Sequence, residues 1–250
     1  MGMNGHSENT PIDDALAGIV IPFNIYSASA VIAARRYVTL ITEHLSRAHA
    51  NDQKEALRQY HNLSNPDEAS YEEYVRSVDR DYDDSFRPIL YFSTVVYLYM
   101  IFETYVSRHV AELHPNPEGN KYVLTFNKEG GLVKAAQKYF EDRVGIKFFS
   151  EEQWTQLREI AHVRNCIVHD AGIPRDSIKN RDSIYELAKR IWRDQPVGLQ
   201  IDWYQGRDLG CPMILNQRFL EYCLYVLEEF FHALGSAVDE KFRKRDQRNP

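Results

Sequence analysis

Three polar side chains lie close together near the end of a segment that otherwise has the pattern of a buried helix. Within Val163–Gly172, which reads VRNCIVHDAG, they are Arg164, Asn165 and His169. Arginine carries a permanent charge and offers paired N–H donors to an oxyanion. Histidine exchanges a proton near neutral pH, because its unperturbed pKa is about 6.5, and asparagine can orient an imidazole or donate to an oxyanion. The three residue types therefore predict a site that binds an anion and moves a proton.

The helical pattern around these residues sets where each should lie. At about 100° per residue, one apolar stripe forms, with Ile160 and Ile167 on its flank; the stripe comprises Trp154, Leu157, Ala161 and Val168. Arg164 falls inside this stripe, so it needs an anionic partner. Asn165 and His169 are four residues apart and are neighbours at the edge of the stripe.

An earlier apolar helix, predicted from about Asp84 to His114, offers the partner. Glu103 stands on a face of this helix whose other members are apolar or aromatic, namely Val96, Tyr99, Val106 and Val110. We predict that Glu103 and Arg164 lie close together and hold the site in shape. The alternative is a buried ion pair with a purely structural role, because structural networks also place ionisable groups on core faces.

The rest of the chain favours helices as well. Helical patterns extend over Tyr26–Leu63, a short acidic segment, Leu132–Val144, Ser183–Arg193 and Leu215–Phe242. Ser150 and Gln153 have the spacing of a capping box at the start of the motif helix, and Gly172 and Pro174 are expected to end it. The segment VGLQIDW alternates like a short strand. The prediction is an all-α protein with at most a small β-hairpin.

Composition narrows the class of protein. The 250 residues include 44% hydrophobic side chains and carry a net charge of −6, which argues against a protein that coats DNA by neutralising phosphates. Cys166, Cys211 and Cys223 are odd in number and contain no CxxC pair, so a disulfide framework is not expected. The longest uncharged apolar stretch, Ile89–Phe102, is shorter than the ~20 residues of a membrane span. We expect a soluble cytoplasmic protein with no membrane association.

The spacing Arg164-Asn165-x-x-x-His169 resembles the signature motif of the HEPN superfamily of helical proteins, many of which are RNases. The resemblance covers roughly Asp84 to Phe242, and it implies a HEPN-like helical domain over residues 84–250 with an N-terminal helical extension over residues 1–83.

The resemblance also implies an activity. The expected protein is a metal-independent endoribonuclease that needs no cofactor and leaves 2′,3′-cyclic phosphate ends. Arg164, Asn165 and His169 would be its catalytic residues, supported by Glu103 and Asp170. Family members act as homodimers with two motifs facing each other, and they occur in toxin–antitoxin pairs and in phage defence, so an antitoxin or sensor partner is expected by analogy. Some toxin members carry His-x-Tyr, whose Tyr a nucleotidyltransferase modifies; here Ala171 stands at that position.

Two alternatives stay open at this point. A HEPN-like protein could bind RNA or a partner protein without cutting. A zinc site is the other alternative, because His162, Cys166 and His169 share one helix face and zinc favours nitrogen and sulfur ligands, although no fourth ligand is identifiable. RNA cleavage in the presence of EDTA separates the three, since only the metal-independent RNase stays active.

Overall fold

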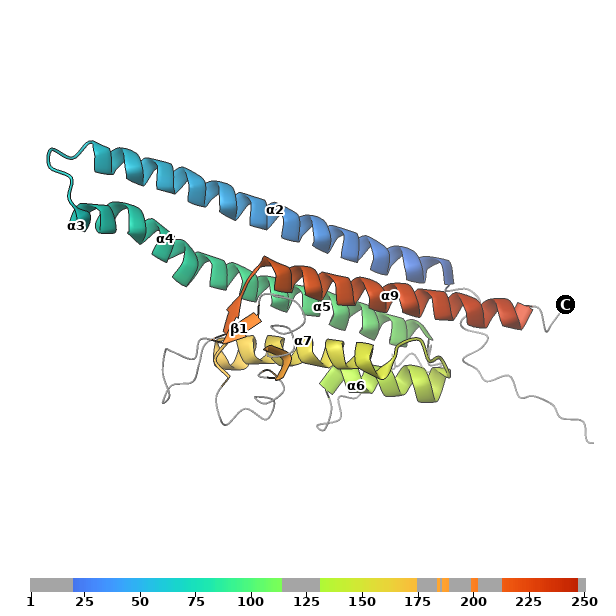
Figure 1. The fold of residues 1–250 in the computed structure, drawn as a ribbon. Helices are drawn as coiled ribbons and strands as arrows, with labels where there is room; N and C mark the ends of the chain where they lie inside the picture. The colour runs from blue at the N-terminus through green and yellow to red at the C-terminus, as the bar shows by residue number, and fades with distance from the viewer. Residues whose placement is uncertain are drawn as a thin grey trace, which may run out of the picture. The chain divides into compact units, whose positions relative to one another are not determined.

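The computed structural model describes residues 20–113, 131–174, 184, 186–188, 199–201 and 213–246. In this part of the chain nearly all regular structure is helical (Figure 1), which confirms the predicted all-α class. The principal helices are α2 (Val20–His61), α3 (Glu68–Tyr71), α4 (Ser77–Asp81), α5 (Arg87–Leu113), α6 (Gly131–Lys138), α7 (Glu151–Asp170) and α9 (Gln217–Asp246).

Two short strands form the predicted hairpin. β1 (Leu199–Ile201) pairs with β2 (Met213–Leu215) in antiparallel register, so that Leu199 lies opposite Leu215. Within the predicted polar helix near Ser183–Arg193, Ile184 and Glu186–Ala188 are helical, and the remainder lies outside the described residues.

The chain divides into two compact units. Unit 1 takes residues from Met1–Val31, Met100–Arg158 and Tyr225–Pro250, and unit 2 takes residues from Ile32–Tyr99 and Glu159–Leu224. Unit 2 therefore includes residues on both sides of the division predicted between residues 83 and 84, and that division stays a prediction.

Unit 1 has an aromatic core centred on Phe230 of α9. Its ring meets five others edge-on at centroid distances between 5.1 and 5.6 Å; these are Phe102, Phe148, Phe149, Trp154 and the adjacent Phe231. Edge-to-face pairs contribute about 0.5–1.5 kcal/mol each beyond their burial. Phe102 belongs to α5 and Trp154 to the first turn of α7, so this cluster joins three helices that are far apart in the sequence.

The start of α7 is fixed by the predicted capping box. Ser150 N donates to Gln153 Oε1 at 3.0 Å, and Gln153 N donates to Ser150 Oγ at 3.2 Å. Both donors would otherwise lack an intrahelical acceptor. The box therefore sets where the motif helix begins.

In unit 2, one loop joins α2 to the segment α3–α5, and these two arms lie side by side (Figure 1). Two π-helical turns, Glu72–Arg76 and Tyr82–Phe86, interrupt the second arm. In the second of them, Arg87 N–H donates to Tyr82 O, five residues back. This i→i+5 bonding places Tyr82 and Arg87 on one face, and both side chains contact α2.

One apolar window, within Glu68–Ala111, has a mean hydropathy of 1.4, which would suffice for a membrane span by length and composition alone. Within the protein, 44% of that window is buried. Core helices of globular proteins reach the same hydropathy, because a helix that is apolar all round is buried in a core or in a membrane.

Candidate functional site

The motif residues occupy the last two turns of α7, and all of them belong to unit 2. Arg164, Asn165 and Asp170 are half-buried, whereas His169 is exposed. The buried face of the helix holds the apolar residues Ile160, Val163 and Cys166. The helix therefore presents these polar residues at the boundary between core and solvent.

Arg164 is held by two neighbours within unit 2. Its Nη1 donates to Asn165 Oδ1 at 2.9 Å, and its guanidinium carbon lies 5.6 Å from the centroid of the buried Tyr99 ring. Because a guanidinium has only donors, the asparagine atom that faces it is the carbonyl oxygen. Asn165 thus positions Arg164, which is a different role from orienting the His169 ring.

The predicted apolar stripe is correct in its first three turns and wrong at its end. Trp154, Leu157 and Ala161 are buried as expected, but Val168 is 46% exposed. The buried residues of the last turns are Val163 and Cys166, so the buried face departs from the predicted stripe, and Val168 and His169 are adjacent exposed residues. An exposed valine beside a candidate catalytic histidine is a surface that another chain could cover.

The turn after α7 is fixed by glycine, as predicted. Gly172 has a φ of 79°, its N–H donates to Cys166 O at 3.1 Å, and its carbonyl accepts from Met213 N at 2.9 Å. Ala171 before it has a φ of 52°, a left-handed conformation that costs a residue with a Cβ about 1 kcal/mol. These bonds tie the end of the motif helix to strand β2.

The predicted partner of Arg164 belongs to the other unit. Glu103 is half-buried on α5 in unit 1, and its neighbours Val106 and Val110 are fully buried, so it does stand on a core face. The pairing of Glu103 with Arg164 stays a prediction.

Cys166 is poorly suited to act as a nucleophile or a metal ligand. Burial, with a smaller contribution from the charge of Asp170, raises the pKa of its thiol to about 12, so the thiolate is scarce at neutral pH. Among the described residues, no three His, Cys, Asp or Glu side chains are grouped as metal ligands. The zinc alternative on His162, Cys166 and His169 therefore gains no support from the geometry.

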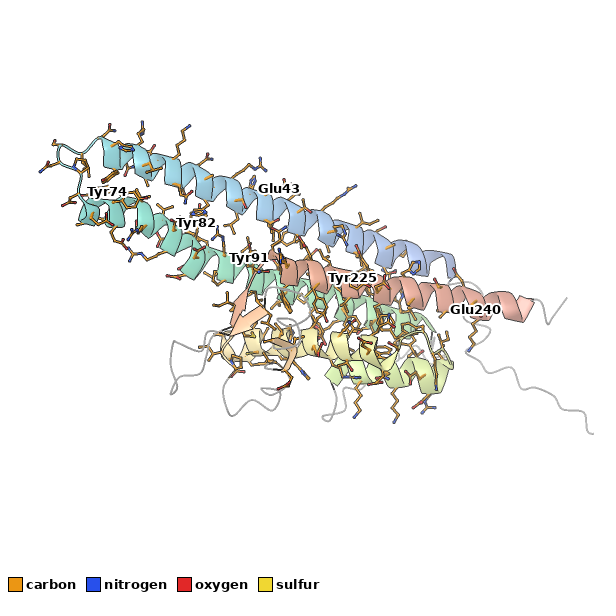
Figure 2. The ribbon with its side chains drawn as sticks, in the orientation of Figure 1. Glu43, Tyr74, Tyr82, Tyr91, Tyr225 and Glu240 are labelled. Atoms are coloured by element: carbon orange, nitrogen blue, oxygen red, sulfur yellow. The ribbon has the colours of Figure 1, made fainter. Side chains whose placement is uncertain are left out.

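A second polar cluster in unit 2 was not predicted. His49 on α2 contacts Asp79 of α4 through Nε2 at 2.8 Å and Arg87 of α5 through Nδ1 at 3.0 Å. Arginine cannot accept a hydrogen bond, so Nδ1 is the acceptor and Nε2 carries the proton that is donated to Asp79. Tyr82, labelled in Figure 2, stacks on the His49 ring at a centroid distance of 4.4 Å and donates to Asp52 at 2.7 Å.

This cluster, defined as His49, Asp52, Gln53, Asp79, Tyr82 and Arg87, fastens α2 to the returning arm. Arg87 also pairs with Asp83 one turn away. No local pattern marks the cluster in the sequence, because its members come from segments about 30 residues apart and the π-helical turn changes the spacing. The polar side chains of this cluster on α2 bond to those on the second arm, so the cluster joins the two arms.

Acid should weaken this junction. The pKa of Asp79 is held below its ordinary value by the hydrogen bond from His49 and then by that from Gln53. A carboxylate with a depressed folded pKa stabilises the fold above its unfolded pKa of ~3.9, and this stabilisation is lost as the pH falls through the folded pKa. We expect Asp79→Asn to lower the melting temperature at pH 7. Between pH 5 and pH 2, the melting temperature of this variant should fall less than that of the parent.

The matched control is Asp81→Asn, an exposed aspartate on the same helix. It should leave the melting temperature and its pH dependence close to those of the parent. Equal effects of the two substitutions, measured by thermal unfolding monitored by circular dichroism, would show that the His49–Asp79 bond does not stabilise the fold.

Comparison of the chain with protein-family models, with curated proteins and with solved structures finds no match.

Proposed function

We propose that this protein is a metal-independent endoribonuclease of the HEPN type that acts in the cytoplasm as a homodimer. The observation that supports the proposal is the arrangement at the end of α7. An exposed His169 lies on the same helix end as Arg164, whose guanidinium is positioned by Asn165 and by the Tyr99 ring. A proton-transfer group and a pre-positioned cation are two of the groups that cleavage of a phosphodiester requires.

The reaction needs no group from outside the protein. The ribose 2′-oxygen attacks the phosphorus, the bond from phosphorus to the 5′-oxygen breaks, and a 2′,3′-cyclic phosphate remains. One imidazole takes the proton from the 2′-OH, and a second donates a proton to the departing 5′-oxygen. Arg164 neutralises the charge that grows on the non-bridging oxygens.

One motif supplies only one histidine, so a second copy of the chain would complete the pair. An isologous dimer about a two-fold axis brings the same surface of both copies together. The exposed Val168, next to His169, supplies apolar area for that contact.

Val168→Glu should therefore convert the dimer to a monomer and reduce RNA cleavage with it. In a dimer of this variant, the two carboxylates introduced by Val168→Glu would face each other near the two-fold axis without a cationic partner. Burying an unpaired charge costs several kcal/mol. Light scattering should give twice the 29.2 kDa chain mass for the parent and the single chain mass for the variant. Leu40→Glu, at a 61% exposed site on α2, is the control; a parent that is monomeric at micromolar concentration would contradict the dimer.

The activity itself is tested by incubating the full-length protein with single-stranded RNA in excess EDTA. We expect cleavage with 2′,3′-cyclic phosphate ends. The alternative is a HEPN-like module that binds RNA or a protein partner without cutting. It is favoured by the same contacts of Arg164, because a half-buried arginine bound to Asn165 and stacked on Tyr99 would also serve a structural role. Binding of RNA without cleavage would favour this module.

The biological setting follows by family analogy only. An RNase that is toxic to its host must be restrained, so we propose a role in phage defence or in a toxin–antitoxin pair, with an antitoxin or sensor protein as the regulator.

A further inference from the structure

A large cleft lies in unit 2 beside the end of the motif helix. It has a volume of about 1120 Å³, and Ala171, two residues beyond His169, forms part of its wall. Small-molecule sites are typically ~300–1,000 Å³, so the cleft has room for a nucleotide and part of its neighbour. Every residue that lines it belongs to unit 2.

The floor of the cleft is apolar and aromatic. Tyr91 (Figure 2), Met213 and Leu215 are buried there, and the half-buried Phe92 lies beside them. Burial raises the pKa of Tyr91, so its hydroxyl stays neutral. Aromatic residues in the lining suit a nucleobase, because every nucleobase has a face that stacks on an aromatic side chain.

The rim of the cleft carries both signs of charge, with acceptors in excess. Its three carboxylates belong to Asp83, Asp84 and Glu221, and its two guanidinium groups to Arg87 and Arg218. Arg87 is engaged by Asp83 and by His49. A rim with more carboxylates than guanidinium groups disfavours a phosphate in the cleft and favours a neutral ligand that donates hydrogen bonds.

One helix turn of the rim combines an amide with a carboxylate. Gln217 Nε2 donates to Glu221 Oε1 at 2.8 Å, which leaves acceptor capacity on both side chains. Glutamine is a common partner of adenine, and carboxylates accept from the amino group of cytosine.

A smaller groove of about 560 Å³ shares Gln217 and Glu221 and carries Arg35 and Arg47 on α2. Glu43 lies on the same groove and pairs with Arg47, so this groove, like the larger cleft, carries both signs of charge.

We propose that the larger cleft binds one unpaired nucleobase that carries an exocyclic amino group, and that Asp84 and Glu221 select it by accepting its hydrogen bonds. This inference rests on the proposed function, in which single-stranded RNA is the substrate, and it adds the selectivity of that site. The base would lie beside the end of α7, so the cleft would determine which phosphodiester reaches His169.

The test measures binding, so it does not depend on catalysis. The probes are decamers of 2′-O-methyl adenylate, cytidylate and uridylate, which cannot be cleaved because the attacking oxygen is blocked. Their dissociation constants for the full-length protein are measured by fluorescence anisotropy. We expect the adenylate and cytidylate decamers to bind about tenfold more tightly than the uridylate decamer, since a good base-edge contact is worth ~1–3 kcal/mol.

The double variant Asp84→Ala/Glu221→Ala should lose this preference, so that all three decamers bind alike. Both positions are exposed, so the truncations should not unfold the protein. Removing carboxylates also strengthens RNA binding in general, and Glu73→Ala controls for this, because Glu73 is exposed and lies outside both clefts. It should shift all three constants equally and keep their ratio.

Equal binding of the three decamers by the parent, or a preference that survives in the double variant, would overturn the inference. A parent that shows either result and still cleaves RNA overturns the inference alone. A parent that prefers the amino-bearing decamers, with the preference lost in the double variant, but cleaves no RNA overturns the catalytic proposal alone. A parent that binds none of the decamers and also cleaves no RNA overturns both.

Discussion

Replacing His169 with alanine is expected to lower the rate of RNA cleavage by about 10²–10⁴, the usual cost of losing a general acid–base group. The side chain is exposed, so its removal opens no cavity and the melting temperature should stay within about 2 °C of the parent value, the shift expected for a neutral surface substitution. The measurement is the initial rate on single-stranded RNA in EDTA, with folding checked by circular dichroism.

Arg164→Ala should abolish cleavage to a similar degree and should also cost some stability. The guanidinium stacks on the buried Tyr99 ring and bonds to Asn165, and such a stem contributes packing as well as charge. Comparing the two variants therefore separates a chemical loss from a structural one.

The control for both is His232→Ala, which removes another exposed histidine on α9. It should leave the rate unchanged. If the His169→Ala protein cleaves RNA as fast as the parent, the assignment of the site is wrong.

Gly172→Ala should produce the largest loss of stability among these substitutions, about 3 kcal/mol in the free energy of unfolding. A Cβ at this position would lie 2.4 Å from Phe92 Cε2 and 2.6 Å from Cζ, and overpacking of this kind typically costs ~1–3 kcal/mol. The φ of 79° adds strain for any residue with a Cβ, about 1–2 kcal/mol. The measurement is equilibrium unfolding in urea.

Gly145→Ala is the matched control. Gly145 also has a left-handed backbone, with a φ of 68°, but its added Cβ would meet nothing within 4 Å. Only the backbone strain remains there, about 1 kcal/mol. The double variant Gly172→Ala/Phe92→Ala should recover part of the loss, because the clash is removed. Equal losses at the two glycines would show that the Phe92 ring does not constrain the turn.

The helices were predictable because their signals are local. Apolar spacing, the Ser150–Gln153 capping box and the stop at Gly172 all act within a few residues, and each has the predicted role in the structure. The candidate motif was found in the same way, because Arg164, Asn165 and His169 lie within six residues on one helix. The hairpin was anticipated in part, from the alternation around β1.

The structure differs from the sequence-based predictions where tertiary packing overrides the helical periodicity. Val168 has the periodicity of a core residue, yet it is 46% exposed, because the residues that α7 buries in its last turns are Val163 and Cys166. The contact of Arg164 Nη1 with Asn165 Oδ1 was not anticipated, because it depends on the rotamers of both side chains.

Local signals predict the all-α class, the position of the motif helix and the types of residue at its end, because propensity, capping and periodicity are properties of short segments. Helix packing alone brings His49 to Asp79 and Arg87, and places Phe92, Met213 and Glu221 around one cleft with Ala171. These residues are distant in the chain, so their meeting depends on how helices pack. A π-helical turn at Tyr82–Phe86 then shifts the facing side chains in a way that no simple period predicts.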